Sequence, residues 1–183
     1  MKIDLENNLG VHPSPVAMIS SGDMENSNIA TIAWTGIISS EPMIVYVSIR
    51  PSRFSNEIIT KTKEFVINLP DEKLVKIADF CGTKSGKDLD KFETCKLTKR
   101  QSDMVSVPYI EECPINLECQ VIDIQKFDSH EMFVAKVVKT HCDENILDEN
   151  GEVNFSKANL ITFAGKKYFA NNQEVGYRGC GVK

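Results

Sequence analysis

The sequence has no long hydrophobic run and no excess of positive charge. No window of the 183-residue chain approaches the roughly 18 consecutive apolar residues that a membrane-spanning helix needs. The N-terminal segment 1–8 is polar and lacks the apolar region of a secretory signal. The net charge of −5 argues against a general nucleic-acid binder, which needs a basic face. We therefore expect a cytoplasmic protein with no membrane and no nucleic-acid partner.

The sequence also lacks the cysteine and histidine spacings of metal sites and disulfide frameworks. No Cys-x-x-Cys pair occurs, and the three histidines show no zinc-type spacing. We expect no metal site and six reduced thiols, at Cys81, Cys95, Cys113, Cys119, Cys142 and Cys180. A redox role for Cys81 is the less favoured interpretation, because no resolving cysteine stands near it in the sequence.

The sequence does not contain three motifs of nucleotide-binding sites and catalytic nucleophiles. Segment 82–88 resembles a P-loop only faintly, since it has three residues between its glycines and Asp88 in place of the final Ser or Thr. Segment 176–181 has the wrong spacing for a dinucleotide fingerprint. No Gly-x-Ser-x-Gly elbow is present. If the protein uses a nicotinamide nucleotide, it does so without a Rossmann domain.

What is present is a strand-rich pattern. With 42% apolar and 26% charged residues, the chain suits one packed domain spanning residues 1–183. Apolar periodicity and turn residues predict two helices, one starting at Ser52 or Ser55 and one over 72–80 that Asp71 caps. The predicted strands are 16–20, 28–35, 43–50, 64–69, 115–127, 131–141, 160–164 and 167–170. We expect a mainly β (α+β) fold, a closed barrel with short peripheral helices, and an irregular, extended tail at 171–183.

The segment 28–54 combines an aromatic side chain with cations. Trp34 precedes Gly36, which permits close backbone approach, but a lone tryptophan is normally a core residue. Arg50 and Arg53 flank the predicted helix start, where backbone N–H groups attract anions. Solvated arginines and an anion site both remain open on spacing alone. By themselves, Lys91 reads as a surface lysine and His130 as a solvated residue at a hairpin tip.

Five sequence blocks resemble flavoredoxin and the flavin reductase-like proteins in order and spacing. They are Asn28-x-x-Thr31-x-x-Trp34-Thr35-Gly36, Ser48-Ile49-Arg50-Pro51-Ser52-Arg53-x-Ser55, Cys81-Gly82-x-x-Ser85-Gly86-x-Asp88-x-Asp90-Lys91-Phe92, Leu117-Glu118-Cys119 and Ser129-His130-x-Met132-Phe133. Each block is weak alone, but five in order are specific. The resemblance implies an FMN-binding split β-barrel that forms a homodimer, with flavin near the subunit interface.

The resemblance also implies a set of FMN-binding residues and no dedicated catalytic residue, because the flavin carries the chemistry. Three of them, Ser48, Arg50 and Arg53, match the phosphate side of the family's pocket. The full implied set is Asn28, Trp34, Thr35, Gly36, Ser48, Arg50, Arg53, Ser55, Lys91, His130 and Phe163.

Three functions remain open at this point. One is an NAD(P)H-dependent flavin reductase that passes hydride through bound FMN. The second is a flavoredoxin-like carrier that receives electrons from a redox protein. The third is a non-catalytic module that binds flavin or another ligand.

Overall fold

The computed structural model describes residues 1–6, 10–170 and 172–182 of the chain. The predicted polar start includes Asn7 and Asn8, and the predicted tail includes Asn171 and Lys183, all of which lie outside the described residues. Among the helices that the structure describes, none combines the length and apolar character required to cross a bilayer.

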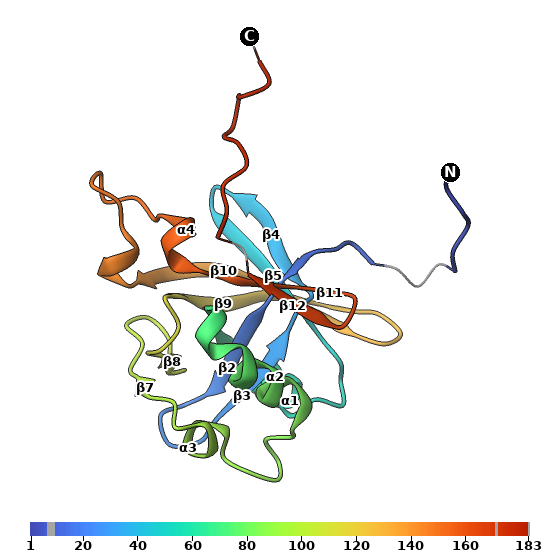
Figure 1. Cartoon of the computed structure of the whole chain (residues 1–183). Coiled ribbons are helices and arrows are strands. Elements are labelled where there is room, and N and C mark those ends of the chain that lie inside the picture. The colour runs from blue at the N-terminus through green and yellow to red at the C-terminus, as the bar shows by residue number, and fades with distance from the viewer. Residues whose placement is uncertain (7–9, 171, 183) are drawn as a thin grey trace.

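The fold is mainly β and is built on one seven-stranded antiparallel sheet (Figure 1). Its spatial order is β3-β2-β6-β9-β10-β5-β4. The strands are β2 (Ala17–Gly22), β3 (Ser27–Ile32), β4 (Thr35–Ser40), β5 (Met43–Ile49), β6 (Glu64–Leu69), β9 (Ile115–Lys126) and β10 (Glu131–Cys142). Two small sheets accompany it, β1 (Ser14–Pro15) with β11 (Ile161–Ala164) and β12 (Lys167–Ala170), and β7 (Lys99–Arg100) with β8 (Tyr109–Ile110).

The prediction of a closed barrel is wrong, because the sheet stays open between β3 and β4. These strands follow each other in the chain, yet they form the two opposite edges of the sheet. Ala33 and Trp34 separate them, and among the described strands β4 pairs only with β5. The backbone N–H of Ser48 in β5 donates to the Trp34 carbonyl at 2.9 Å. The result is a split barrel with an opening next to Trp34.

Short helices cover the sheet. They are α1 (Phe54–Thr62), α2 (Val75–Thr83), α3 (Lys91–Cys95), α4 (Phe155–Ala158) and the 3₁₀ turns η1 (Glu72–Leu74) and η2 (Glu144–Ile146). Asp71 accepts hydrogen bonds from the N–H groups of Lys73 and Leu74, as the capping prediction requires. Both α2 and α3 contact β3, which places them at the open edge of the sheet (Figure 1).

Two apolar cores hold these layers together. Inside the barrel, side chains from β2, β5, β6, β9 and β10 pack with Ile59 of α1, and Phe65 and Phe133 are fully buried. The second core joins β2 and β3 to α2, α3 and β11 through Met18, Ile29 and Phe92. Burial of this apolar area is the main stabilising contribution to such a fold.

Two element predictions differ from the structure. The strand predicted over 28–35 ends at Ile32, and the separate strand β4 was missed. The N-cap of α1 is Arg53, with no side-chain cap, so the prediction of a serine cap is wrong. Ser55 instead points inward and is buried, because it hydrogen-bonds to Asn28 of β3.

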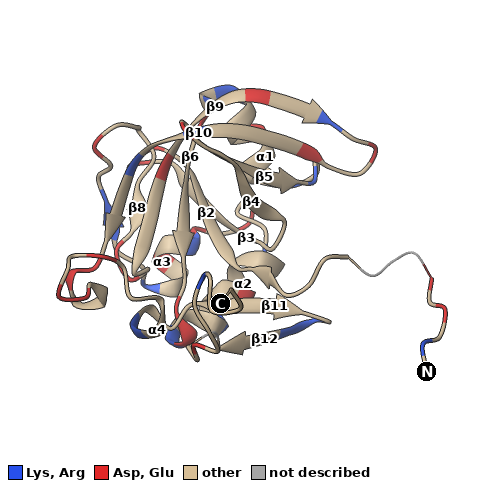
Figure 2. Cartoon of the chain, turned by 90° about the horizontal axis from the view of Figure 1, so that it is seen from above, with Lys and Arg blue, Asp and Glu red and all other residues tan. Residues whose placement is uncertain are grey.

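The predicted strands 16–20, 43–50, 64–69, 115–127, 131–141, 160–164 and 167–170 all have counterparts in the structure. Residues 172–182 contain no helix or strand and, in Figure 1, run away from the sheet. The blue Lys and Arg positions and the red Asp and Glu positions are interspersed over strands, helices and loops of the ribbon (Figure 2).

Candidate functional site

A pocket of about 400 Å³ opens where the split in the sheet meets the start of α1 and the loop after α2. Its walls come from β3 and the following turn, the end of β5, the first turn of α1, the segment 81–86, Lys91 and the β9–β10 hairpin at His130. Elements far apart in the sequence therefore converge on one hollow.

Eight of the eleven predicted site residues line this pocket. They are Asn28, Trp34, Ser48, Arg50, Arg53, Ser55, Lys91 and His130. Their role in binding FMN stays a prediction, but their convergence in one hollow is what a shared ligand requires.

The other three predicted residues lie elsewhere. The Thr35 hydroxyl donates to the Tyr46 carbonyl at 2.6 Å, and Gly36 lies against the Tyr46 ring, so both serve the β4–β5 pairing. Phe163 lines a neighbouring hollow of about 350 Å³, where its ring packs against Tyr168 at a centroid distance of 5.2 Å. The two hollows share the wall segment 31–33 and Gly82.

Lys91 is a buried cation at the pocket wall, with 3% of its surface exposed. Its Nζ donates to the carbonyls of Ile29 at 2.6 Å and Cys81 at 2.7 Å. An ammonium has three donors, and the third N–H of Lys91 has no acceptor among the described residues. Burial lowers the pKa of Lys91; the Cys81 sulfur opposes this shift, and the charge of Arg53 adds to it. The wall therefore offers a desolvated cation with a spare donor.

Polar atoms beside Lys91 are also left without partners. The Asn28 amide donates to the Ser55 hydroxyl at 2.8 Å, but Asn28 Oδ1 has no hydrogen-bond partner within the described part of the chain. Thr31 Oγ1 is likewise buried, with no partner among residues 1–6, 10–170 and 172–182. Gly86 packs so closely on Asn28 that a Cβ there would clash with Asn28 Oδ1. Since buried polar groups are rarely unsatisfied, these atoms fit a ligand that supplies hydrogen bonds.

Arg50 and Arg53 stand exposed at the start of α1. Neither guanidinium has an ion-pair or hydrogen-bond partner among the described residues. The first N–H groups of a helix also lack intrahelical partners and attract anions. Both arginines line the pocket together with Ser52 and Ser55. In a chain of net charge −5, this local gathering of cations without partners among the described residues is suited to bind an anion.

Trp34 and His130 form the aromatic side of the pocket. Their ring centroids are 4.5 Å apart with a tilt of 37°. Trp34 is 54% exposed, so the core interpretation of this tryptophan is wrong. His130 Nδ1 lies 2.8 Å from the Ser129 hydroxyl, and burial, followed by the nearby charge of Arg50, lowers the pKa of His130. A flat ligand finds an apolar, uncharged aromatic face here.

Several lining residues were not assigned from the sequence. Thr31, Cys81, Ser85 and Gly86 belong to the blocks that carry the family resemblance, which is the signal that could have identified them. Lys84 also lines the pocket, and no sequence signal distinguishes it from a surface lysine.

Comparison with known proteins identifies the family. The family model described as "Flavin reductase like domain" matches residues 9–170. The chain belongs to the flavin reductase-like family. An uncharacterized protein of Archaeoglobus fulgidus is 31% identical to it over 164 residues, covering 90% of this chain and 92% of the relative. The shared split-barrel fold confirms the predicted family and fold class.

Two solved structures resemble this chain over all or nearly all of its length. Flavoredoxin of Desulfovibrio vulgaris (Miyazaki F) superposes with a TM-score of 0.93 at 28% identity, covering 100% of both chains. An FMN-binding protein from Thermus thermophilus has a TM-score of 0.82 at 23% identity and 97% coverage of both chains, which shows the shared fold. The pocket residues of this chain fit FMN, since they combine an anion site, unsatisfied hydrogen-bonding atoms and an aromatic face.

A second polar cluster, Asp103, Glu118 and His141, brings its ligand atoms within 4.8 Å of one another. The buried Glu118 carboxylate accepts hydrogen bonds from the N–H groups of Asp103 at 2.9 Å and Met104 at 2.7 Å, and it lies 2.5 Å from His141 Nε2. Lys139 lies 3.4 Å from the Asp103 carboxylate. Because protein donors already occupy these oxygens, we interpret the cluster as the anchor of the loop 101–107 and not as a metal site.

Proposed function

We propose that the protein binds FMN in this pocket and acts as a flavin reductase-type oxidoreductase that passes hydride and electrons from NAD(P)H through the flavin. One observation carries the proposal. An exposed Trp34 lies beside two unpaired arginines at a helix N-terminus, with the buried ammonium of Lys91 in the same wall. An aromatic plane next to an anion site is the recognition that a phosphorylated aromatic cofactor requires.

Each part of the pocket has a role in this proposal. Arg50, Arg53 and Ser55 bind the phosphate through charge-assisted hydrogen bonds, supported by the N-terminus of α1 and by Ser48. Trp34 and His130 bound the ring system and exclude water from one side of it. FMN, when bound, supplies the hydride and electron chemistry.

Lys91 contributes charge in the same proposal. Its third N–H donates either to the phosphate or to the electron-rich edge of the ring. A fixed cation there favours an electron-rich ligand and raises its reduction potential. No residue of the pocket is required as a dedicated acid or base.

A flavoredoxin-like electron carrier is the alternative function. It is favoured by the similarity to the Desulfovibrio vulgaris flavoredoxin along the full length of both chains, and by the lack of a dinucleotide fingerprint in the sequence. In this alternative the same FMN site receives electrons from a redox protein.

We also propose a cytoplasmic homodimer. Its support is the edge strand β4, which pairs on one side only and carries the exposed side chains of Ile37 (72%) and Ile38 (52%) next to Trp34. An unpaired, apolar sheet edge is a surface that a second chain readily covers.

A turnover assay tests the function. Protein loaded with FMN is mixed with NADH or NADPH and an excess of free flavin or ferric chelate, and nucleotide oxidation is followed. We expect catalytic oxidation of at least one nucleotide. Retained FMN without turnover would support the carrier instead. Failure to retain FMN would reject both and leave a binding module for another ligand.

A further inference from the structure

Ser55, in the first turn of α1, receives hydrogen bonds from two neighbouring strands of the sheet. The Asn28 amide donates from Nδ2 to Ser55 Oγ at 2.8 Å, and the Ser21 hydroxyl donates to the same oxygen at 3.4 Å. The second distance is long for a pair of hydroxyl groups, so the bond from Asn28 is the stronger one. Ser21 and Asn28 stand opposite each other in the pairing of β2 with β3. Two donors from the sheet therefore converge on one hydroxyl oxygen.

These two bonds occupy the acceptor side of the Ser55 hydroxyl and leave its proton unused. A serine hydroxyl has two acceptor lone pairs and one O–H donor. Asn28 and Ser21 fill the lone pairs, whereas the Ser55 proton has no acceptor among the described residues. All three side chains are buried, so water outside the pocket does not reach them. Because Ser55 lines the pocket, its proton is available to a ligand there.

The orientation of the Asn28 amide gives its bond a single direction. Asn28 Oδ1 lies against Gly86, where a Cβ would clash with it, and Nδ2 points to Ser55. The amide oxygen thus faces the loop after α2, and the amide nitrogen faces α1. An amide NH₂ group donates hydrogen bonds and accepts none. Asn28 therefore takes a lone pair of Ser55 and does not compete for its proton.

We propose that Ser21 and Asn28 are positioning residues that make the Ser55 hydroxyl a hydrogen-bond donor toward an anionic group in the pocket. Ser21 lies outside the set of residues that line the pocket, so it acts on the ligand only through Ser55. This role rests on the proposed FMN site, in which Ser55 binds the phosphate. A phosphate dianion has acceptor oxygens and no donor. A hydroxyl held as a donor therefore favours FMN over riboflavin.

The charges around Ser55 agree with this polarity. No aspartate or glutamate occurs among the described residues that line the pocket, so no carboxylate there takes the Ser55 proton. The charged lining residues are all basic: Arg50, Arg53, Lys84 and Lys91. Cations attract an anion to the pocket, but they do not determine which way a neutral hydroxyl points. The donors from β2 and β3 supply that direction.

Calorimetric titration of the full-length protein with FMN and with riboflavin tests the positioning role. Ser55→Ala should lower the preference for FMN about fivefold, the effect of one lost hydrogen bond. Asn28→Ala keeps the Ser55 hydroxyl but frees it to rotate, and should lower the preference about threefold to fivefold. Ser21→Ala should lower it about twofold, because its bond is longer. Ser55→Thr keeps a hydroxyl group and should retain the preference. A wild-type preference in both Asn28→Ala and Ser21→Ala would overturn the proposal.

A double variant separates positioning from direct contact with the ligand. Asn28→Ala combined with Ser55→Ala should lose no more preference for FMN than Ser55→Ala alone, because Asn28 acts through the Ser55 hydroxyl. Additive losses would show that Asn28 binds the phosphate by itself. Asn56→Ala is the matched control, since Asn56 is buried in α1, donates to Glu131 Oε2 at 2.8 Å and is absent from the pocket lining. It should lower the melting temperature and leave the preference unchanged; an equal loss of preference would make the effect a general one of stability.

Inorganic phosphate provides a measurement that does not depend on flavin. Phosphate should raise the melting temperature of the wild type, and raise it less in Asn28→Ala, Ser21→Ala and Ser55→Ala. This difference in a protein that retains no FMN would reject the proposed function and leave the positioning role in place. FMN binding with the same preference and the same phosphate effect in every variant would reject the positioning role alone. If Asn28→Ala fails to fold, Ser21→Ala makes the same comparison from outside the pocket.

Discussion

Trp34 shows how position in the fold decides the role of one side chain. A lone tryptophan is normally a core residue, but this one stands in the turn between β3 and β4 with 54% of its surface exposed. The turn exists because β4 leaves β3 and pairs with β5. Because the ring is exposed beside His130, it contributes little to the stability of the fold and is available to contact a flat ligand.

Replacing Trp34 with alanine should therefore weaken FMN binding without unfolding the protein. We expect the dissociation constant for FMN to rise about tenfold, which corresponds to roughly 1.4 kcal/mol of lost aromatic contact. The melting temperature should change little. Phe155→Ala removes an equally exposed ring in α4, outside the pocket, and should leave FMN affinity unchanged. Equal affinities in both variants would contradict the role of Trp34.

Lys91 is different because it is both a site residue and a structural one. Lys91→Ala leaves the carbonyls of Ile29 and Cys81 without their donor inside the core. We expect the free energy of unfolding to fall by about 2–3 kcal/mol. FMN affinity and the reduction potential of bound FMN should also fall, measured by denaturation, titration and potentiometry. Lys76→Ala on the exposed face of α2 is the control, and a potential that rises in Lys91→Ala would refute the electrostatic role.

At the scale of elements, β5 and α1 together build the anion site. Arg50 directly follows the end of β5, and Arg53 is the N-cap of α1. Two guanidinium groups and a helix N-terminus therefore lie at one pocket. Charge-assisted hydrogen bonds of this kind depend on the phosphate and not on the ring of the ligand.

Replacing both Arg50 and Arg53 with glutamine should abolish discrimination between FMN and riboflavin. For the wild type we expect FMN to bind at least about 100-fold more tightly, since two charge-assisted contacts contribute about 1.5–3 kcal/mol each. The double variant should bind the two flavins within about fivefold. Calorimetric titration measures both affinities. Arg178→Gln in the tail is the control, and discrimination that survives in the double variant would place the phosphate elsewhere.

Glu118 links β9 to the loop 101–107 and gives stability a pH dependence. Burial raises the pKa of Glu118, but hydrogen bonds from His141 and the N–H groups of Asp103 and Met104 outweigh it, and the net pKa is lowered. The pKa of Glu118 is lower in the folded state than in the unfolded state. The ionised carboxylate therefore stabilises the fold at pH values above the unfolded-state pKa. This stabilisation is lost as the pH falls through the folded-state pKa.

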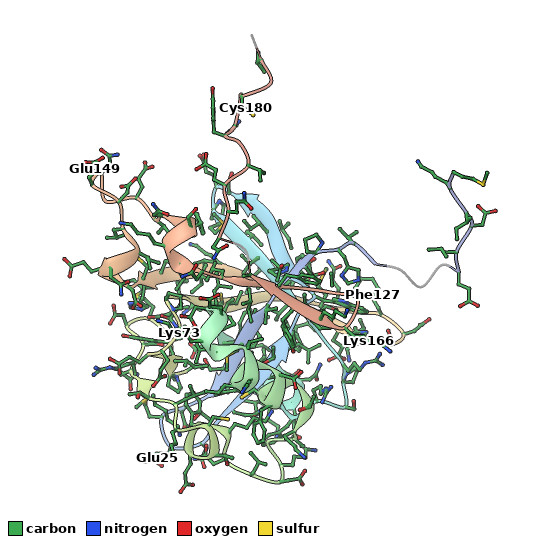
Figure 3. The ribbon with its side chains drawn as sticks, viewed as in Figure 1. Glu25, Lys73, Phe127, Glu149, Lys166 and Cys180 are labelled. Carbon is green, nitrogen blue, oxygen red and sulfur yellow. The ribbon has the colours of Figure 1, made fainter. Side chains whose placement is uncertain are left out.

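Glu118→Gln should therefore destabilise the protein by about 1.5–3 kcal/mol at neutral pH, with a smaller difference in acid. Urea unfolding at several pH values measures this difference. Glu149→Gln, on the exposed loop where Figure 3 labels Glu149, should leave the free energy of unfolding almost unchanged. If the difference in unfolding free energy between wild type and Glu118→Gln instead grows as pH falls, the proposed role of ionised Glu118 is wrong.

Local sequence patterns predicted most helices and strands, but they failed where tertiary contacts determine the end of an element or the role of a side chain. The alternation of β5 and the Asp71 cap of η1 could be read from the sequence, because both depend on near neighbours. The end of β3 at Ile32 could not, since an apolar run has no local signal for a change of pairing partner. Ser55 was misread as a cap because its partner, Asn28, lies 27 residues away.

For the whole molecule, the family resemblance predicted the fold and the distant site residues, which hydrophobic periodicity alone could not predict. It predicted the split barrel and brought Lys91 and His130, distant in sequence, to the same site as Trp34. It did not reveal that Phe163 lines the adjacent hollow, because that position depends on how α2 and β11 pack.

Whether this pocket holds FMN can be read from the visible spectrum of the protein. The protein is incubated with FMN, passed through a desalting column and scanned before and after anaerobic addition of NADH. If the pocket holds FMN, the protein stays yellow with about one FMN per chain, and NADH bleaches it if the protein is a reductase. A colourless protein after desalting, from a sample that is folded and monodisperse, would show that the pocket does not hold FMN.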